Sequence, residues 1–146
     1  DAKPRMIEWL KRGYIIVADR YITSNKAHQG ARRNGKERQQ IIDHFDKLEY
    51  KTYELPAPYL NIFLDLPVGF SIDAMKQQNR KKDINEKNMN YQMEVRKIFR
   101  QIHKNIKPSY KGLIVSCINK KGARKSRSEI ADRVWNVVNE RILSRI

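Results

Sequence analysis

Three short apolar runs constrain the fold of this chain more than any other feature of its sequence. They cover residues 14–18, 60–66 and 113–117, and they read YIIVA, LNIFLDL and LIVSC. Runs of this length, rich in leucine and β-branched residues, are typical of strands buried on both faces. Longer segments with apolar residues at helical spacing separate the runs. Strands joined by crossover helices form a parallel sheet that helices cover on both sides, so the sequence predicts an α/β fold.

Six segments around these runs have the pattern of helices. Pro4 suits a first helical turn and Gly13 a helix end, while Ser128 caps or opens the last helix, in which Trp135 is expected to be a core anchor. The sequence contains no internal repeat or low-complexity tract, so we expect residues 1–146 to form a single domain. The predicted helices cover residues 4–12, 25–30, 37–49, 68–79, 86–103 and the chain from 128 onward.

The strong positive charge raises the question of a polyanionic partner. The chain has 31 Lys and Arg against 16 Asp and Glu, a formal net charge of +15. Such a balance favours contact with nucleic acids. However, the basic residues are scattered over every segment, and no aromatic RNA-binding motif is present. We therefore expect solvated basic faces and no nucleic-acid partner, although residues 80–82 and 120–127 form two local basic clusters.

Cysteine content and hydropathy limit which classes of protein this chain can belong to. Cys117 is the one cysteine, which excludes an internal disulfide framework and a multi-cysteine metal site. This usage suits a reducing compartment, and we expect a cytoplasmic protein. No apolar run approaches the roughly 20 residues that cross a bilayer, so no membrane partner is expected.

An acid and a base stand side by side directly after the first apolar run, at Asp19 and Arg20. In open α/β sheets ligands bind beyond the carboxyl ends of the strands. There a carboxylate can hold Mg²⁺ or its waters, and a guanidinium can clamp a phosphate through two hydrogen bonds. Such a pair suits phosphoryl transfer, which depends on positioning and electrostatic stabilisation. An arbitrary Asp-Arg pair more often forms a surface salt bridge.

The surrounding residues favour the first interpretation. Residues 19–32, DRYITSNKAHQGAR, resemble the signature of the thymidylate kinase family. Four further segments are similar to that family in the same order along the chain. They are PRMIEWLKRGYIIVADRY, LEYKTYELPAPYLNIFLDLP, the lid-like RKKDINEKNMNYQMEVRKIF and the terminal-helix segment KSRSEIADRVWNVV.

The resemblance implies a site for dTMP. Asp19 would be the Mg²⁺-associated carboxylate, and Arg20 would hold the phosphate of dTMP. Ser24 and Asn25 fall where the family contacts the nucleotide monophosphate, and Gln29 where many members approach the thymine. His28 stands where a tyrosine often packs against the deoxyribose, which leaves discrimination against ribonucleotides open.

The resemblance also implies an ATP-binding lid at residues 79–86. Arg80 would contact the transferring phosphate, with Lys81 and Lys82 beside it in the cofactor site. Tyr91 matches an aromatic position at the start of the following helix and is assigned to the substrate site. The implied cofactors are ATP and Mg²⁺, and the implied assembly is a homodimer.

One required part of such an enzyme is missing from these residues. None of the six glycines takes part in the pattern G-x-x-x-x-G-K-[S/T], whose backbone N–H groups cradle ATP phosphates. The family has a three-layer P-loop kinase fold with sheet order 2-3-1-4-5, and the runs seen here would be strands 3, 4 and 5. We therefore expect a preceding segment that carries strand 1 and the phosphate loop, and we expect residues 1–146 alone to be inactive.

Two alternatives remain. A kinase for another nucleoside monophosphate is suggested by His28, and a non-catalytic basic nucleic-acid-binding domain by the net charge. An assay with several monophosphates would distinguish the first from a dTMP kinase. Salt-dependent binding to nucleic acid would favour the second.

Overall fold

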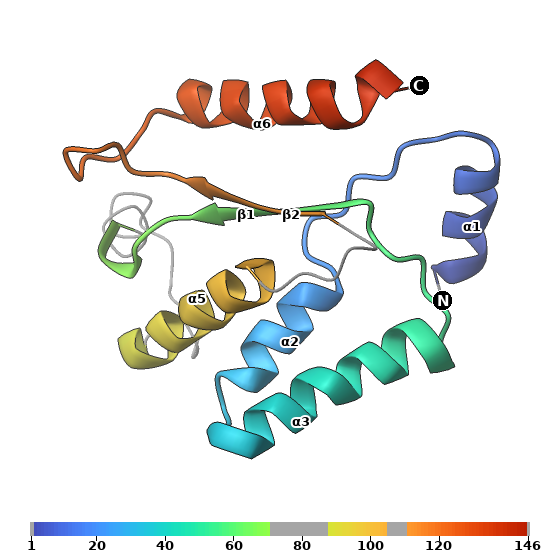
Figure 1. Cartoon of the computed structure of the whole chain (residues 1–146), viewed down its shortest axis with the longest axis horizontal. Coiled ribbons are helices and arrows are strands. Elements are labelled where there is room, and N and C mark those ends of the chain that lie inside the picture. Colours follow the sequence, from blue (N-terminus) through green and yellow to red (C-terminus); the bar gives the residue numbers. More distant parts are fainter. Residues whose placement is uncertain (1, 71–87, 105–110, 146) are drawn as a thin grey trace. The chain divides into compact units, whose positions relative to one another are not determined.

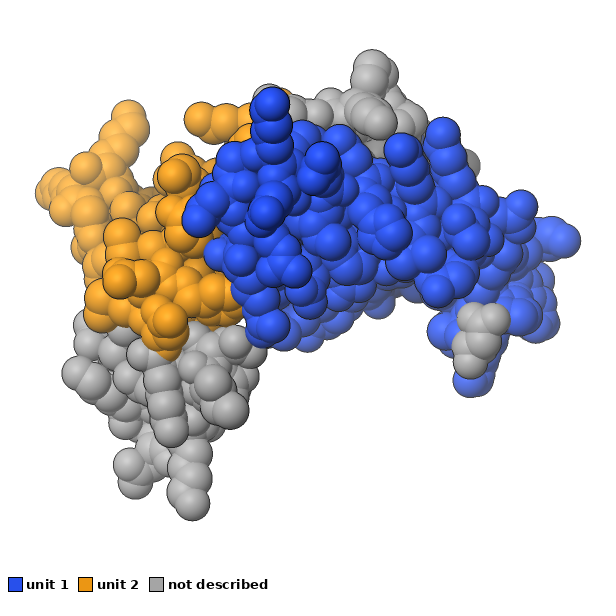
Figure 2. All heavy atoms as spheres, turned by 90° about the horizontal axis from the view of Figure 1, so that it is seen from below, with its two compact units in different colours: residues 1–59 blue, residues 60–146 orange. Residues whose placement is uncertain are grey.

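The structure is a computed structural model that describes residues 2–70, 88–104 and 111–145. The chain divides into two compact units, residues 1–59 and 60–146, which Figure 2 colours separately. The expectation of a single domain over residues 1–146 stays a prediction.

Unit 1 is helical in its described residues. It contains α1 (Lys3–Lys11), α2 (Ile22–Gly30), α3 (Gly35–Asp46) and a π-helical segment, Lys47–Thr52, that continues α3 (Figure 1). The first predicted helix is confirmed: Pro4 lies in its first turn, and Gly13 follows its end with φ of 81°. A glycine adopts this left-handed conformation without the steric cost that other residues meet, so it ends the helix there.

The predicted strand over residues 14–18 is not formed. The segment has no strand conformation, and its side chains are largely exposed, with Val17 92% exposed. A strand needs a neighbouring strand to bond its N–H and C=O groups. The described part of unit 1 contains no other strand that could do so. An apolar pattern therefore predicts a strand only where a neighbouring strand is present, and residues 14–18 lack one among the described residues of unit 1.

Unit 2 is a small α/β layer structure. Strands β1 (Leu60–Asp65) and β2 (Lys111–Ser116) pair in parallel, with Leu60 opposite Lys111 and Asp65 opposite Ser116. Helices α5 (Met89–Lys104) and α6 (Arg127–Arg141) lie on opposite sides of this pair (Figure 1). Two of the three predicted strands are therefore confirmed as parallel neighbours, as the family order implies for strands 4 and 5. The wider order 2-3-1-4-5 stays a prediction.

The core of unit 2 lies between α5 and the strands. The rings of Phe63 and Phe99 stack with centroids 4.9 Å apart, and the ring of His103 lies 5.5 Å from that of Phe63. Ile98 is fully buried, and Val95 and Val115 are nearly so. Apolar residues at i, i+3 and i+4 of α5 produce this contact, as the amphipathic pattern predicts.

Helix α6 differs from the sequence-based expectation in two respects. Its N-cap is Ser126 and not Ser128: the Ser126 hydroxyl accepts a hydrogen bond from the backbone N–H of Glu129, and the Glu129 carboxylate accepts one from the N–H of Ser126. This reciprocal pair is a capping box, which satisfies two N–H groups at the helix start. Trp135 is 59% exposed, so it is not a core anchor.

Two further predicted helices border segments that lie outside the described residues. Residues 68–70 are helical, and the rest of the predicted helix 68–79 lies outside the described residues. Helix α5 begins at Met89, where the side chain of Asn88 accepts a hydrogen bond from the N–H of Tyr91. Within the described ranges, no helix is both long enough and apolar enough to cross a membrane.

Candidate functional site

The segment that carries Asp19 and Arg20 leads directly into α2. Both side chains are exposed, and neither makes a hydrogen bond or ion pair with another described residue. Arg20 has φ of 67°, in the left-handed region that non-glycine residues adopt rarely. Backbone strain of this kind gathers at functional sites. The pair is thus held in a defined turn with both charged groups available to a ligand.

Tyr21 connects this turn to Pro56, near the C-terminal end of unit 1. Its phenol donates a hydrogen bond to the carbonyl of Pro56 at 3.1 Å, and its backbone is extended at the N-cap of α2. Burial, and secondly the carboxylate of Glu49, raise the pKa of the Tyr21 phenol. Tyr21 therefore stays neutral near pH 7 and acts as a hydrogen-bond donor that anchors the turn.

Helix α2 separates a buried face from a more accessible one. Its buried residues are Ile22, Thr23, Lys26, Ala27 and Gly30. The four residues assigned to the nucleotide, Ser24, Asn25, His28 and Gln29, occupy the remaining positions. Asn25 donates a hydrogen bond to Glu49 at 3.3 Å, and Ser24 and His28 are half-buried. The helix thus places all four predicted residues on the same face.

A buried ion pair holds α2 against α3. The ammonium of Lys26 lies 2.5 Å from Oδ1 of Asp46, and Lys26 is only 3% exposed. A buried lysine is rare unless it is paired with a carboxylate. This pair explains why a charged residue stands on the inner face of α2, and it sets the position of the helix that carries the predicted substrate residues.

The predicted site is only partly brought together. Asp19, Arg20, Ser24, Asn25, His28 and Gln29 all belong to unit 1, whereas Tyr91 belongs to α5 in unit 2. Arg80, Lys81 and Lys82, together with the rest of the predicted lid at 79–86, lie outside the described residues. The described part of the chain contains no group of three or more acidic, histidine or cysteine side chains that could enclose a metal ion.

Mg²⁺ does not need such an enclosure. In phosphate-transferring sites it usually keeps several waters and binds one or two carboxylates together with substrate phosphates. An exposed carboxylate without an ion pair to a described residue, as at Asp19, fits this type of coordination. The donor set present in unit 1 is therefore compatible with Mg²⁺ held through Asp19.

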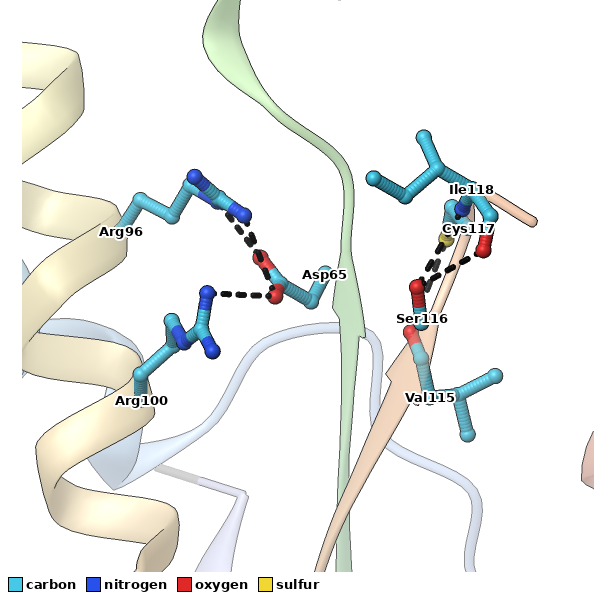
Figure 3. Close-up of polar contacts among 7 residues, drawn as sticks. All are labelled: Asp65, Arg96, Arg100, Val115, Ser116, Cys117 and Ile118. Atoms are coloured by element: carbon cyan, nitrogen blue, oxygen red, sulfur yellow. Dashed lines mark hydrogen bonds and ion pairs between the residues drawn. The ribbon is translucent and has the colours of Figure 1, made fainter. Parts of the chain in front are cut away.

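Unit 2 contains a charged cluster that the sequence analysis missed. Asp65, at the carboxyl end of β1, is 6% exposed, and its carboxylate forms ion pairs with two arginines of α5 (Figure 3). Arg96 makes a forked contact, with Nε 2.6 Å from Oδ1 and Nη2 3.2 Å from Oδ2. Nη1 of Arg100 lies 3.3 Å from Oδ2. Such bidentate pairs are geometrically specific, so the cluster fixes α5 to the end of β1.

A signal for this cluster was present in the sequence. Arg96 and Arg100 are four residues apart, so they lie on the same side of a helix. An aspartate that ends a buried strand needs a partner, because burying an unpaired carboxylate is costly. The helix prediction considered the apolar residues of α5 and did not pair Arg96 and Arg100 with Asp65.

The sequence of this chain is similar to those of known proteins. A family model described as thymidylate kinase matches residues 2–116, which is more than half of the chain. A thymidylate kinase of Fervidobacterium nodosum is 36% identical over 72 residues, covering 49% of this chain and 34% of the relative. One of Rhodopseudomonas palustris is 29% identical over 137 residues, covering 92% of this chain and 54% of the relative. The chain thus spans about half the length, or less, of these curated relatives.

Proposed function

Because the chain belongs to the thymidylate kinase family, we propose that the protein transfers the γ-phosphoryl group of ATP to dTMP, giving dTDP and ADP. The observation that supports this most directly is the Asp19-Arg20 turn, whose two charged groups are exposed and bind no other described side chain. The proposal concerns a protein in which this chain is joined to a phosphate loop, since residues 1–146 contain none.

In this proposal Arg20 binds the phosphate of dTMP. A guanidinium is permanently charged and offers two parallel N–H donors, which match the oxygens of a phosphate. Its strained φ of 67° fixes the direction from which the side chain starts. Asp19 holds Mg²⁺, which when bound neutralises charge on the phosphates during transfer. Positioning of donor and acceptor, more than covalent chemistry, is the contribution of these residues.

The accessible face of α2 carries the nucleoside part of the substrate site. We assign Ser24 and Asn25 to contacts with the nucleotide monophosphate, Gln29 to the thymine and His28 to the deoxyribose. Tyr91 is assigned to the substrate from α5. The Lys26–Asp46 ion pair supports this face from the opposite side of the helix.

The phosphate donor is proposed to be ATP. Arg80, Lys81 and Lys82 are assigned to its phosphates, as cationic donors near the developing charge. The protein is further proposed to be a cytoplasmic homodimer. Size-exclusion chromatography with light scattering measures the last point directly.

The proposal is tested with a coupled ADP-release assay on the full-length gene product with MgATP and, in separate reactions, dTMP, dUMP, UMP and dGMP. We expect dTMP to be the preferred acceptor.

Arg20→Ala and Asp19→Asn are expected to lower kcat/KM for dTMP by about 10²–10³-fold, the usual cost of removing a group that stabilises transition-state charge. Arg133→Ala and Asp132→Asn are matched controls, since both residues are exposed on α6 without a described partner. Equal losses in the control variants, or no rate with dTMP, would refute the assignment.

His28 favours a second candidate, a kinase for another nucleoside monophosphate. It occupies α2 at the position assigned to the sugar, where the family often has a tyrosine. A higher kcat/KM for UMP than for dTMP in the same assay would support this candidate. Reversal of that preference in His28→Tyr would locate the discrimination at this residue.

A further inference from the structure

The loop between β2 and α6 concentrates positive charge in an ordered structure. The loop together with Arg127, the first residue of α6, is called here the basic hairpin; these residues, 117–127, contain five Lys or Arg and no Asp or Glu. In Figure 1 the hairpin extends beyond the start of α6. The side chains of four of these cations are exposed and make no hydrogen bond or ion pair to any described residue: Lys120, Lys121, Arg124 and Arg127.

The hairpin is held by its own backbone. Ile118 and Arg124 form an antiparallel bridge, and the N–H of Asn119 donates to the carbonyl of Ala123 at 2.8 Å. The side-chain oxygen of Asn119 accepts hydrogen bonds from the N–H groups of Lys121 and Ala123, at 2.9 and 3.0 Å. Gly122 occupies the turn with φ of 80°. A loop ordered in this way loses little backbone entropy when it binds a ligand.

No described carboxylate forms an ion pair with the four exposed cations of the hairpin. The carboxylate of Glu129 accepts the N–H of Ser126 at 2.7 Å in the capping box. Asp65 is buried beneath Arg96 and Arg100. Of the five cations, Lys125 alone has a described partner, since its ammonium donates to the carbonyl of Ser116 at 3.0 Å. The hairpin therefore presents four exposed cations that are not paired with a carboxylate of the described residues.

We propose that the basic hairpin binds the phosphate backbone of nucleic acid without base specificity. Several separate exposed cations match a polymer with a regular series of single negative charges. Residues 117–127 contain no aromatic side chain, so base stacking is not available. The net charge of +15 did not by itself predict such a partner, because the basic residues are spread along the sequence. The hairpin, in contrast, brings four exposed cations together on an ordered backbone.

A membrane surface fits this hairpin less well. Interfacial membrane binding combines basic residues with exposed apolar side chains that enter the headgroup region. Cys117 is buried and Ile118 half-buried, and the remaining hairpin residues are polar or small. We therefore select nucleic acid as the partner, and anionic vesicles serve as the competing outcome of the test.

The test is fluorescence anisotropy of a labelled DNA duplex of mixed sequence, titrated with the full-length protein between about 50 and 200 mM salt. The hairpin variant is K120Q/K121Q/R124Q. The matched control is K11Q/K36Q/K51Q, which removes the same charge from exposed lysines of unit 1 that have no described partner. Circular dichroism verifies that both variants keep the helix content of the wild type.

We expect the slope of log K against log salt to become shallower by about 2–3 in the hairpin variant, from a loss of about 0.9 per phosphate contact. The control variant should change this slope by less than half as much. Equal effects in both variants, or no duplex binding by the wild type, would overturn the proposal. So would vesicles of anionic lipid that bind with the same dependence on the hairpin, or displacement of the duplex by an equal phosphate concentration of ATP. No phosphoryl transfer is measured, so the result is independent of the proposed kinase activity.

Discussion

At the scale of single residues, the structure shows the surroundings of two side chains that carry reactive groups. His103 and Cys117 carry ordinary reactive groups, yet both are buried in unit 2. The Nδ1–H of His103 donates to the carbonyl of Phe99 at 2.8 Å, and its ring packs against two phenylalanines. Burial lowers the pKa of His103, more than the hydrogen bond to Phe99 raises it. The imidazole is therefore neutral in the folded protein near pH 7.

The lowered pKa of His103 predicts a loss of stability in mild acid. As pH falls below about 6.5, the unfolded chain gains a proton at this residue while the folded chain does not, until the lowered pKa is reached. The free energy of unfolding should thus be constant in this respect above pH 7 and fall by at most about 1.4 kcal/mol per pH unit below 6.5. Urea titrations at several pH values measure this slope.

His103→Asn keeps a donor near the Nδ1 position and removes the titration, so its stability should vary less between pH 7.5 and 5.5. His44→Asn is the control, because His44 is exposed on α3. An unchanged pH dependence in His103→Asn would contradict the prediction.

At the scale of elements, helices were predicted well and one strand was not. Helices α1, α3, α5 and α6 follow from apolar spacing and from local end signals such as Pro4 and Gly13, although the sequence analysis placed the cap of α6 at Ser128 and the structure has it at Ser126. These signals act within a few residues. A strand also needs a partner, and the segment 14–18 has none among the described residues. For the site, the Asp19-Arg20 pair was evident from sequence, whereas the Asp65 cluster depends on packing between α5 and β1.

The ion pair between α2 and α3 predicts that replacing Lys26 strongly lowers the stability of the protein. Lys26→Ala leaves the partly buried Asp46 without its cation, and we expect unfolding to be easier by about 3 kcal/mol, the low end for a broken buried pair. Lys26→Met with Asp46→Leu should recover most of this loss, because an apolar pair of similar volume is often neutral. Chemical denaturation measures both values.

Lys36→Ala on the exposed surface of α3 is the control and should lie within about 0.5 kcal/mol of the wild type. A loss of less than about 1 kcal/mol in Lys26→Ala would show that the ion pair does not hold the two helices together.

At the scale of the whole molecule, the unpaired apolar segment 14–18 is the main departure from the expected fold. In the proposed kinase this segment becomes a strand when a neighbouring strand is present. Its N–H groups would then be protected from exchange with solvent. Among bonds to the residues that the structure describes, only the N–H of Tyr14 in this segment is bonded, to the carbonyl of Trp9 at 3.0 Å.

Hydrogen exchange followed by mass spectrometry or NMR tests this expectation. Amides 15–18 should exchange about 10²-fold more slowly in the full-length protein than in the 146-residue chain. Amides of β2 are the internal reference, since they are bonded to β1 in the present structure and we expect no change of this pairing in the full-length protein. Equally fast exchange at 15–18 in both proteins would mean that the segment is not a strand of the complete fold.

The burial of Cys117 gives unit 2 an intrinsic reporter of its own opening. This is the sole thiol of the chain, and burial, with a smaller contribution from Asp65, raises its pKa. Reagents that modify thiolates therefore react slowly with it while β2 and its neighbours stay packed. The rate at which a disulfide dye labels this sulfur measures how often the layer opens, with no engineered probe.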